Sequence, residues 1–166
     1  MTNRKTLIKI LFATIIILMA IHQQVVAQVA PVGKYNTNNY AKDRKEIELV
    51  SSRMDSTQYL NDDMIAVGPE GRVSYGFEQW KQGFVENGAK FKSVKPVPGT
   101  YVLRVYNGNA AVKNVVVDVV FDTPKGDMAI TVVRTETYIK QNNKWYFVAG
   151  QGTKKLTDAE LAAMMK

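Results

Sequence analysis

Apolar residues recur along the chain at two different spacings, and the change comes near Phe91. Tyr40, Ile47, Val50 and Met54 recur at helical spacing among charged residues, which predicts a helix from about Tyr40 to Arg53. "FEQWKQGFV" repeats that spacing, and Gly88 is placed to end the second stretch. Between the two, Asp55 and Ser56 offer an N-cap for a further short helix, and "MIAV" predicts a short strand closed by the turn "GPEG".

Beyond Phe91 the chain is rich in β-branched and aromatic residues. Four or five long antiparallel strands are predicted, separated by the hairpin-type turn sequences "PVPG", "NGN", "DTPKGD" and "QNN". Thr157 and Glu160 then form a T-x-x-E capping box ahead of a terminal helix. Helices followed by strands predict an α+β fold with helices packed on one face of an antiparallel sheet.

Strand alternation shows where charges fall within these apolar segments. One face of "VVVDVVF" is uninterrupted by polar residues and consists of Val115, Val117, Val119 and Phe121. Four charges interrupt the other strand positions: Arg104, Asp118, Arg134 and Glu136. A sheet that is apolar on one face and mixed on the other is expected to be covered by helices on one side and partly covered on the other.

The N-terminus predicts export. Arg4, Lys5 and Lys9 precede the uncharged run "ILFATIIILMAI", and Val25 and Ala27 stand at the −3 and −1 positions of an A-x-A-like cleavage site. We predict cleavage after Ala27 and a periplasmic or secreted location, with an uncleaved membrane anchor as the alternative. The expected organisation is a signal peptide over 1–27, a flexible tether over 28–39, one domain over 40–153 and a C-terminal helical tail over 154–166.

Composition then removes whole classes of chemistry from the mature chain. The sequence has no cysteine, and its single histidine, His22, lies within the predicted signal. Cysteine and histidine nucleophile chemistry and histidine-ligated metal sites are therefore excluded, and no cofactor or metal is expected. Cleavage also removes three of the 22 basic residues and no acidic one. The remaining charge is scattered, which gives no support to nucleic-acid binding.

The order of several short motifs resembles the nuclear transport factor 2-like superfamily, and most closely its SnoaL-like branch of exported bacterial domains of unknown function. The matching pieces, over about Glu46 to Thr153, are "YLNDDMIAVGPEGRV", "FEQW", "VLRVYNGNAAV" and "VVRTETYIKQNNKWYFVAGQGT". The resemblance implies a cone, in which helices partly fill the concave side of a strongly curved antiparallel sheet. It also implies a pocket in the remaining space and a homodimer formed through the other face of the sheet.

The resemblance leaves the function open, because members include isomerases, dehydratases, hydrolases, cyclases and non-catalytic domains. In ketosteroid isomerase-like members the general base is an aspartate directly before the proline that ends the first strand. Gly68 stands at that position here. Asp62 and Asp63 match an acidic pair ahead of this strand, and we favour capping and turn hydrogen bonds as their role over catalysis.

Two interpretations of the strand charges remain open. In the first, Asp118 and Glu136 act as acid and base in the cone, and Arg104 or Arg134 holds an anion. In the second, which we favour, these residues form cross-strand pairs of opposite charge. The candidate ligand pocket comprises Tyr59, Trp80, Phe84, Arg104, Tyr106, Arg134, Glu136 and Tyr138, although the aromatic members are also natural core residues.

These observations predict an exported binding module that holds a small apolar molecule or a partner segment in its cone. The mature chain is expected to form a homodimer and to bind neither nucleic acid nor membranes. The alternative is a cofactor-independent lyase or isomerase that uses carboxylates. Gly68 and the absence of histidine favour the binding module.

Overall fold

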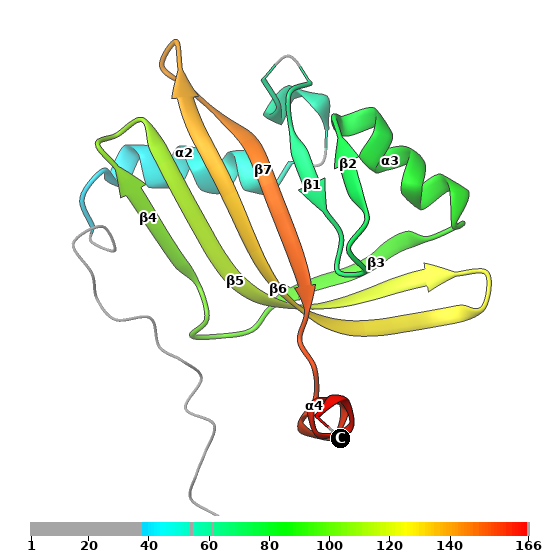
Figure 1. Ribbon diagram of the computed structural model, residues 1–166. Coiled ribbons are helices and arrows are strands. Elements are labelled where there is room, and N and C mark those ends of the chain that lie inside the picture. Colours follow the sequence, from blue (N-terminus) through cyan, green and yellow to red (C-terminus); the bar gives the residue numbers. More distant parts are fainter. Residues whose placement is uncertain (1–37, 54, 61, 166) are drawn as a thin grey trace, which may run out of the picture.

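The computed structural model describes residues 38–53, 55–60 and 62–165. The predicted signal peptide and most of the predicted tether lie outside these residues. Within them the chain folds into an α+β structure in which helices pack on a curled, mostly antiparallel sheet (Figure 1). No helix in this described part is long and apolar enough to cross a membrane.

The helices begin and end close to the predicted positions. They are α2 (Ala41–Ser51), the 3-10 helix η1 (Ser56–Gln58), α3 (Phe77–Glu86) and α4 (Asp158–Met164). Asp55 caps η1 by accepting a hydrogen bond from the backbone N–H of Thr57 at 2.8 Å. Thr157 and Glu160 form the predicted capping box of α4, which confirms that signal.

The sheet has seven strands: β1 (Ile65–Val67), β2 (Val73–Tyr75), β3 (Lys90–Pro96), β4 (Val102–Tyr106), β5 (Ala110–Thr123), β6 (Gly126–Gln141) and β7 (Lys144–Lys154). Their order is β2-β1-β7-β6-β5-β3, with β4 also paired to β5. Strand β2 was not predicted, because three residues are too few to show an alternation. Strand β1 runs parallel to β7. The sheet is therefore mostly antiparallel, whereas the sequence predicted antiparallel pairing throughout.

Two of the predicted turn sequences take the backbone conformation that tight hairpins need. In "NGN", Asn107 and Gly108 have φ values of 50° and 70°, and in "QNN", Asn142 and Asn143 have 51° and 59°. Successive positive φ values match the right-handed twist of the flanking strands, and asparagine and glycine tolerate them best. These turns fix the registers of the β4–β5 and β6–β7 hairpins.

The curvature of the sheet comes from β5, which has different partners along its length. Its first residues pair with β4 and its last with β3, while β6 pairs along the whole strand. Register shifts occur in β3 between Phe91 and Ser93 and in β6 between Thr137 and Tyr138. Such irregularities bend strands. Helices α2 and α3 lie at different ends of the resulting curved sheet, while α4 projects away from it (Figure 1).

The core on the concave face falls into two clusters. The first lies around α2, η1 and the start of α3, and its fully buried large side chains are Trp145, Tyr138, Ile47, Leu103 and Val105. The second consists of Val115, Val117, Val119, Phe121 and Val132, with Phe84, Phe91 and Ile130 packed against it. The predicted apolar face of β5 is thus buried in the second cluster.

Asp62 has the structural role that we favoured for it. Its Oδ1 accepts a hydrogen bond at 2.5 Å from the backbone N–H of Phe77, the first residue of α3. The N-cap position itself is Gly76, which has no side chain that could serve this N–H. Asp62 therefore caps α3 from a distant part of the chain. Its φ of 58° also suits an aspartate or asparagine better than most residues.

We expect Asp62→Ala to lower the free energy of unfolding by about 1 kcal/mol, because α3 loses its capping acceptor. Asp62→Asn should retain most of the stability, since the amide keeps an acceptor oxygen and tolerates the same φ. Asp63→Ala is the matched control, because Asp63 is exposed, and it should change stability by less than about 0.5 kcal/mol. Urea unfolding measures all three, and equal losses for Asp62→Ala and Asp63→Ala would contradict this role.

Candidate functional site

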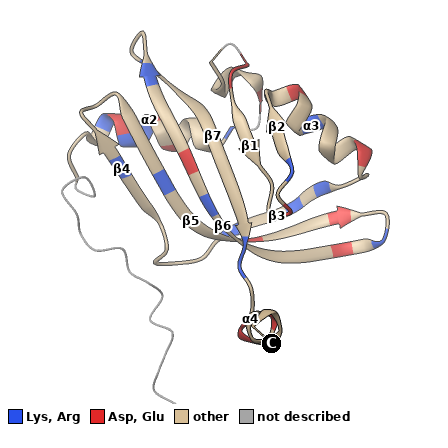
Figure 2. Ribbon diagram, in the orientation of Figure 1, with Lys and Arg blue, Asp and Glu red and all other residues tan. Residues whose placement is uncertain are grey.

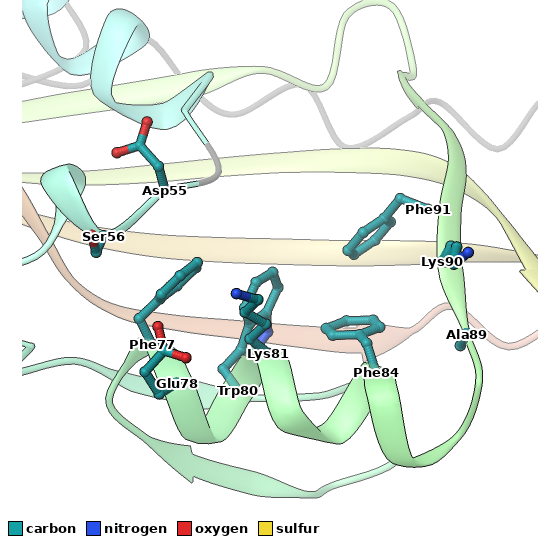
Figure 3. A pocket seen from close by; sticks show the side chains of 10 residues that line it. All are labelled: Asp55, Ser56, Phe77, Glu78, Trp80, Lys81, Phe84, Ala89, Lys90 and Phe91. Atoms are coloured by element: carbon teal, nitrogen blue, oxygen red, sulfur yellow. The ribbon is translucent and has the colours of Figure 1, made fainter.

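An open groove of about 520 Å³ lies between α3, the start of β3 and the 3-10 helix. We call it the α3 groove, and it is lined by Asp55, Ser56, Phe77, Glu78, Trp80, Lys81, Phe84, Ala89, Lys90 and Phe91 (Figure 3). The figure shows the aromatic rings between η1 on one side and β3 on the other. None of the residues that line the groove comes from α2.

The floor of the α3 groove is a continuous row of aromatic rings. Phe77, Trp80 and Phe84 follow at spacings of three and four on α3, so they share one face of the helix. The ring centroids of Trp80 and Phe84 are 4.9 Å apart, and those of Phe84 and Phe91 are 5.0 Å apart. Trp80, Phe84 and Phe91 are only partly buried. An apolar molecule could therefore contact these rings without any rearrangement of the core.

The rim of the groove is polar. Asp55, Glu78, Lys81 and Lys90 are all exposed around the rings. Apolar concave surface with a few polar groups at its edge is the usual composition of a small-molecule site. The two signs of charge balance at the rim, so the rim alone does not select the charge of a ligand.

A second feature lies deeper on the concave face. Glu136 is only 4% exposed. Four side chains form hydrogen bonds or ion pairs with its carboxylate. Lys113 Nζ donates to Glu136 Oε2 at 2.7 Å and Ser51 Oγ donates to the same oxygen at 3.2 Å. Tyr138 OH also donates to Oε2, while Arg134 Nε donates to Oε1. We call these five residues the Glu136 network.

The partners of Glu136 keep it ionised. Burial raises the pKa of this carboxyl, but the positive charges of Arg134 and Lys113 and the hydrogen bonds from Lys113 and Tyr138 outweigh burial and lower it to about 2. Burial, and then the charge of Glu136, raise the pKa of Tyr138, which remains a neutral donor. An ionised carboxylate with both oxygens engaged is a weak base and has no proton to give.

The structure separates the predicted site residues into two groups. Tyr59, Trp80, Phe84, Arg134, Glu136 and Tyr138 lie on the concave side. Arg104, Tyr106 and Asp118 alternate with buried residues of β4 and β5 and so point to the convex face. Asp118 accepts a hydrogen bond from Thr131 Oγ1 at 2.7 Å. Asp118 and Glu136 therefore do not converge, and they cannot act together on one bound molecule.

The interpretation that we favoured, cross-strand pairing of opposite charges, holds for Glu136, but its partner on the neighbouring strand is a lysine and not one of the predicted arginines. Lys113 lies directly opposite Glu136 in the β5–β6 register, and sequence reasoning had not selected it. The alternation of β5 carried the signal, since Lys113 shares its face with Val115. Nothing in the sequence indicated Ser51, because α2 brings it to Glu136 across the fold. Phe77 and Phe91 of the groove were likewise not selected.

We expect the stability of the wild-type protein to fall as the pH is lowered from about 4.5 to about 2. The folded-state pKa of Glu136 is depressed, so its contribution is complete above the unfolded-state pKa and is lost through this window. The loss from this group should reach about 2 kcal/mol at pH 3. Glu136→Gln should start less stable and show a shallower acid dependence in urea unfolding.

Asp118→Asn is the matched control for this experiment, since it removes a carboxylate from the opposite face of the same sheet. It should follow the acid dependence of the wild-type protein. An acid dependence that is unchanged in Glu136→Gln would show that Glu136 is not held ionised by its partners.

Comparison with known proteins places the fold but not the activity. No sequence profile of a known protein family matches the chain. No curated protein matches it either. Among solved structures, a nuclear transport factor 2-like protein from Cytophaga hutchinsonii is 16% identical, with a TM-score of 0.52 over 69% of this chain and 94% of that chain.

Two further solved structures are similar to this chain. A nuclear transport factor 2-like protein of unknown function from Prochlorococcus marinus is 18% identical, with a TM-score of 0.57 over 71% of this chain and 97% of that chain. A protein of unknown function from Mycobacterium tuberculosis is 11% identical, with a TM-score of 0.60 over 80% of this chain and 82% of that chain. At these identities the likeness concerns the fold alone, and the chain therefore has the nuclear transport factor 2-like fold that the sequence resemblance predicted.

Proposed function

We propose that this chain is an exported, non-catalytic binding module that holds a small apolar molecule or a partner's apolar segment in its cone. The α3 groove is the observation that carries the proposal. Its partly exposed rings, Trp80, Phe84 and Phe91, form a concave apolar surface with polar residues only at the rim. Exposed apolar concavities of this kind mark binding sites in proteins.

The alternative is a cofactor-independent lyase or isomerase that uses carboxylates. The Glu136 network argues against it, since both oxygens of Glu136 are engaged and its pKa lies at about 2. Asp118 faces the other side of the sheet. Gly68, at the place of the catalytic aspartate in ketosteroid isomerase-like members, has no proton-accepting side chain. The binding role is therefore the better supported of the two.

We also propose that the mature chain forms a homodimer through the convex face of the sheet. Val102, Val112, Val116, Val133 and Ile139 lie on this face and are half-buried. A second copy would remove their remaining surface from water. The charges along the chain are of mixed sign (Figure 2), in keeping with the absence of a nucleic-acid role in this proposal.

Native mass spectrometry of the protein purified from its own cell envelope tests these three elements together. We expect the mass of a chain that begins at Gln28, assembled as a dimer and carrying a retained apolar molecule. An intact Met1 would contradict export by cleavage. A monomer at micromolar concentration would contradict the dimer.

A neutral apolar dye tests the α3 groove itself. Nile red should bind the purified domain with a rise in fluorescence, and Trp80→Ala should weaken binding by roughly tenfold, because a large aromatic contact is lost. Tyr75→Ala is the matched control, since Tyr75 is 68% exposed and does not line the groove. Equal binding by the wild type and Trp80→Ala would refute the groove as the binding site.

A further inference from the structure

Arg104 lies on the convex face of the sheet without an acceptor in the described part of the chain. It is partly buried, and its Nε is shielded from solvent and donates to no described residue. None of the ion pairs between described residues includes it. A shielded N–H without an acceptor costs free energy, and more so when the group is charged. The guanidinium therefore calls for an acceptor from elsewhere.

The proposed homodimer makes this need greater, because its interface covers Arg104. On β4 the residue stands between Val102 and Tyr106, and it lies opposite Val112 of β5. All four are half-buried on the convex face. A second copy on this face removes further water from the guanidinium, and a charge buried without a partner is strongly unfavourable. A stable interface therefore has to bring a carboxylate to Arg104.

Asp118 is the carboxylate of the convex face that is best placed for this role. The described strands put three carboxylates on this face, those of Asp118, Asp122 and Asp127. Asp127 pairs with Lys92 and lies opposite Asp122 at the far end of the β5–β6 hairpin. Asp118 is exposed, accepts a hydrogen bond from Thr131 and has no ion pair among the described residues. It is therefore open to a cation from a second copy.

The positions of Arg104 and Asp118 suit a two-fold dimer. Arg104 lies opposite Val112, and Asp118 follows Val112 by six residues, about 20 Å along β5. The two side chains are thus too far apart to pair within one chain. A two-fold axis that lies between two facing sheets and runs across β5 midway exchanges the two positions. Val116 and Val133 then lie near the centre of the interface and the charges at its rim, the usual arrangement.

Lys95 is the other cation beside Asp118. It lies directly opposite Asp118 in the β3–β5 register, yet it is exposed and forms no ion pair with a described residue. A lysine ammonium is strongly hydrated and flexible, whereas a guanidinium binds a carboxylate through two N–H groups at once. Lys95 therefore leaves Asp118 available to Arg104.

We infer that in the homodimer Arg104 of each copy forms an ion pair with Asp118 of the other copy, and that these two reciprocal pairs fix how the sheets are aligned. This inference rests on the proposed homodimer and adds its contacts. Burial of the valines is non-directional and would let the sheets slide past each other. Two reciprocal ion pairs select one alignment. Below the dissociation constant of the dimer Asp118 has no such partner, so Asp118→Asn remains the control for Glu136 there.

Two charge reversals test the inference by sedimentation equilibrium of the mature chain. Arg104→Glu and Asp118→Lys should each weaken the homodimer by at least about tenfold, because each puts like charges together at both pairs. An equimolar mixture of the two variants should form a heterodimer with about the dissociation constant of the wild type. In that heterodimer one ion pair is native and the other is reversed, so both are attractive.

Lys95→Gln is the matched control, since it removes a cation directly opposite Asp118 and should change the dissociation constant by less than about threefold. If a reversal prevents folding, Arg104→Gln is the milder change and should weaken the homodimer in the same direction. Reversals that leave the homodimer intact, or a mixture that does not associate, would overturn the inference and leave the homodimer in place. A wild-type chain that is monomeric at micromolar concentration would instead contradict the homodimer itself.

Discussion

Strands β5 and β6 pair without interruption from Ala110 opposite Ile139 to Thr123 opposite Gly126, and the concave face of this long ribbon must be covered. The described helices are much shorter than the ribbon, so no one of them can cover it. Helix α2 covers one end, and the aromatic residues of α3 cover part of the other. The α3 groove lies where this cover is incomplete, and so the groove is a consequence of strand length.

The same constraint explains the Glu136 network. It lies on β5 and β6 between the two apolar clusters, where Lys113 opposite Glu136 is followed by Val115 opposite Arg134. Buried charges are tolerated only when they are paired and hydrogen-bonded. Ser51 and Tyr138 provide the neutral hydrogen bonds that complete the shell of Glu136. The network thus joins α2 to the middle of the sheet.

A second carboxylate, that of Asp43, is paired and hydrogen-bonded in a similar way at the other end of α2. Asp43 accepts hydrogen bonds from Lys140 Nζ at 2.6 Å and from the indole Nε1 of Trp145 at 2.9 Å. Burial raises the pKa of Asp43, but these two bonds and the charge of Lys140 outweigh burial and lower it. Trp145 is itself 1% exposed, so this carboxylate satisfies the one polar group of a core ring. Helix α2 is therefore fixed to the sheet by an acid or hydroxyl near each end.

Local signals in the sequence were enough to predict the helices, all strands but β2, and the packing of helices on one face of a sheet. Helical spacing, strand alternation, the turn sequences around Asn107 and Asn142, and the capping box at Thr157 are all local signals, and the structure reproduces each. Local signals could not reveal strand β2, the parallel pairing of β1 with β7 or the cap of α3 by Asp62, because these depend on residues far apart in the chain. The assignment of faces was also decided only by tertiary structure. Alternation placed Arg134 with Glu136, but only the register of β5 with β6 and the packing of α2 brought Lys113 and Ser51 to that carboxylate and left Arg104 and Asp118 on the convex side.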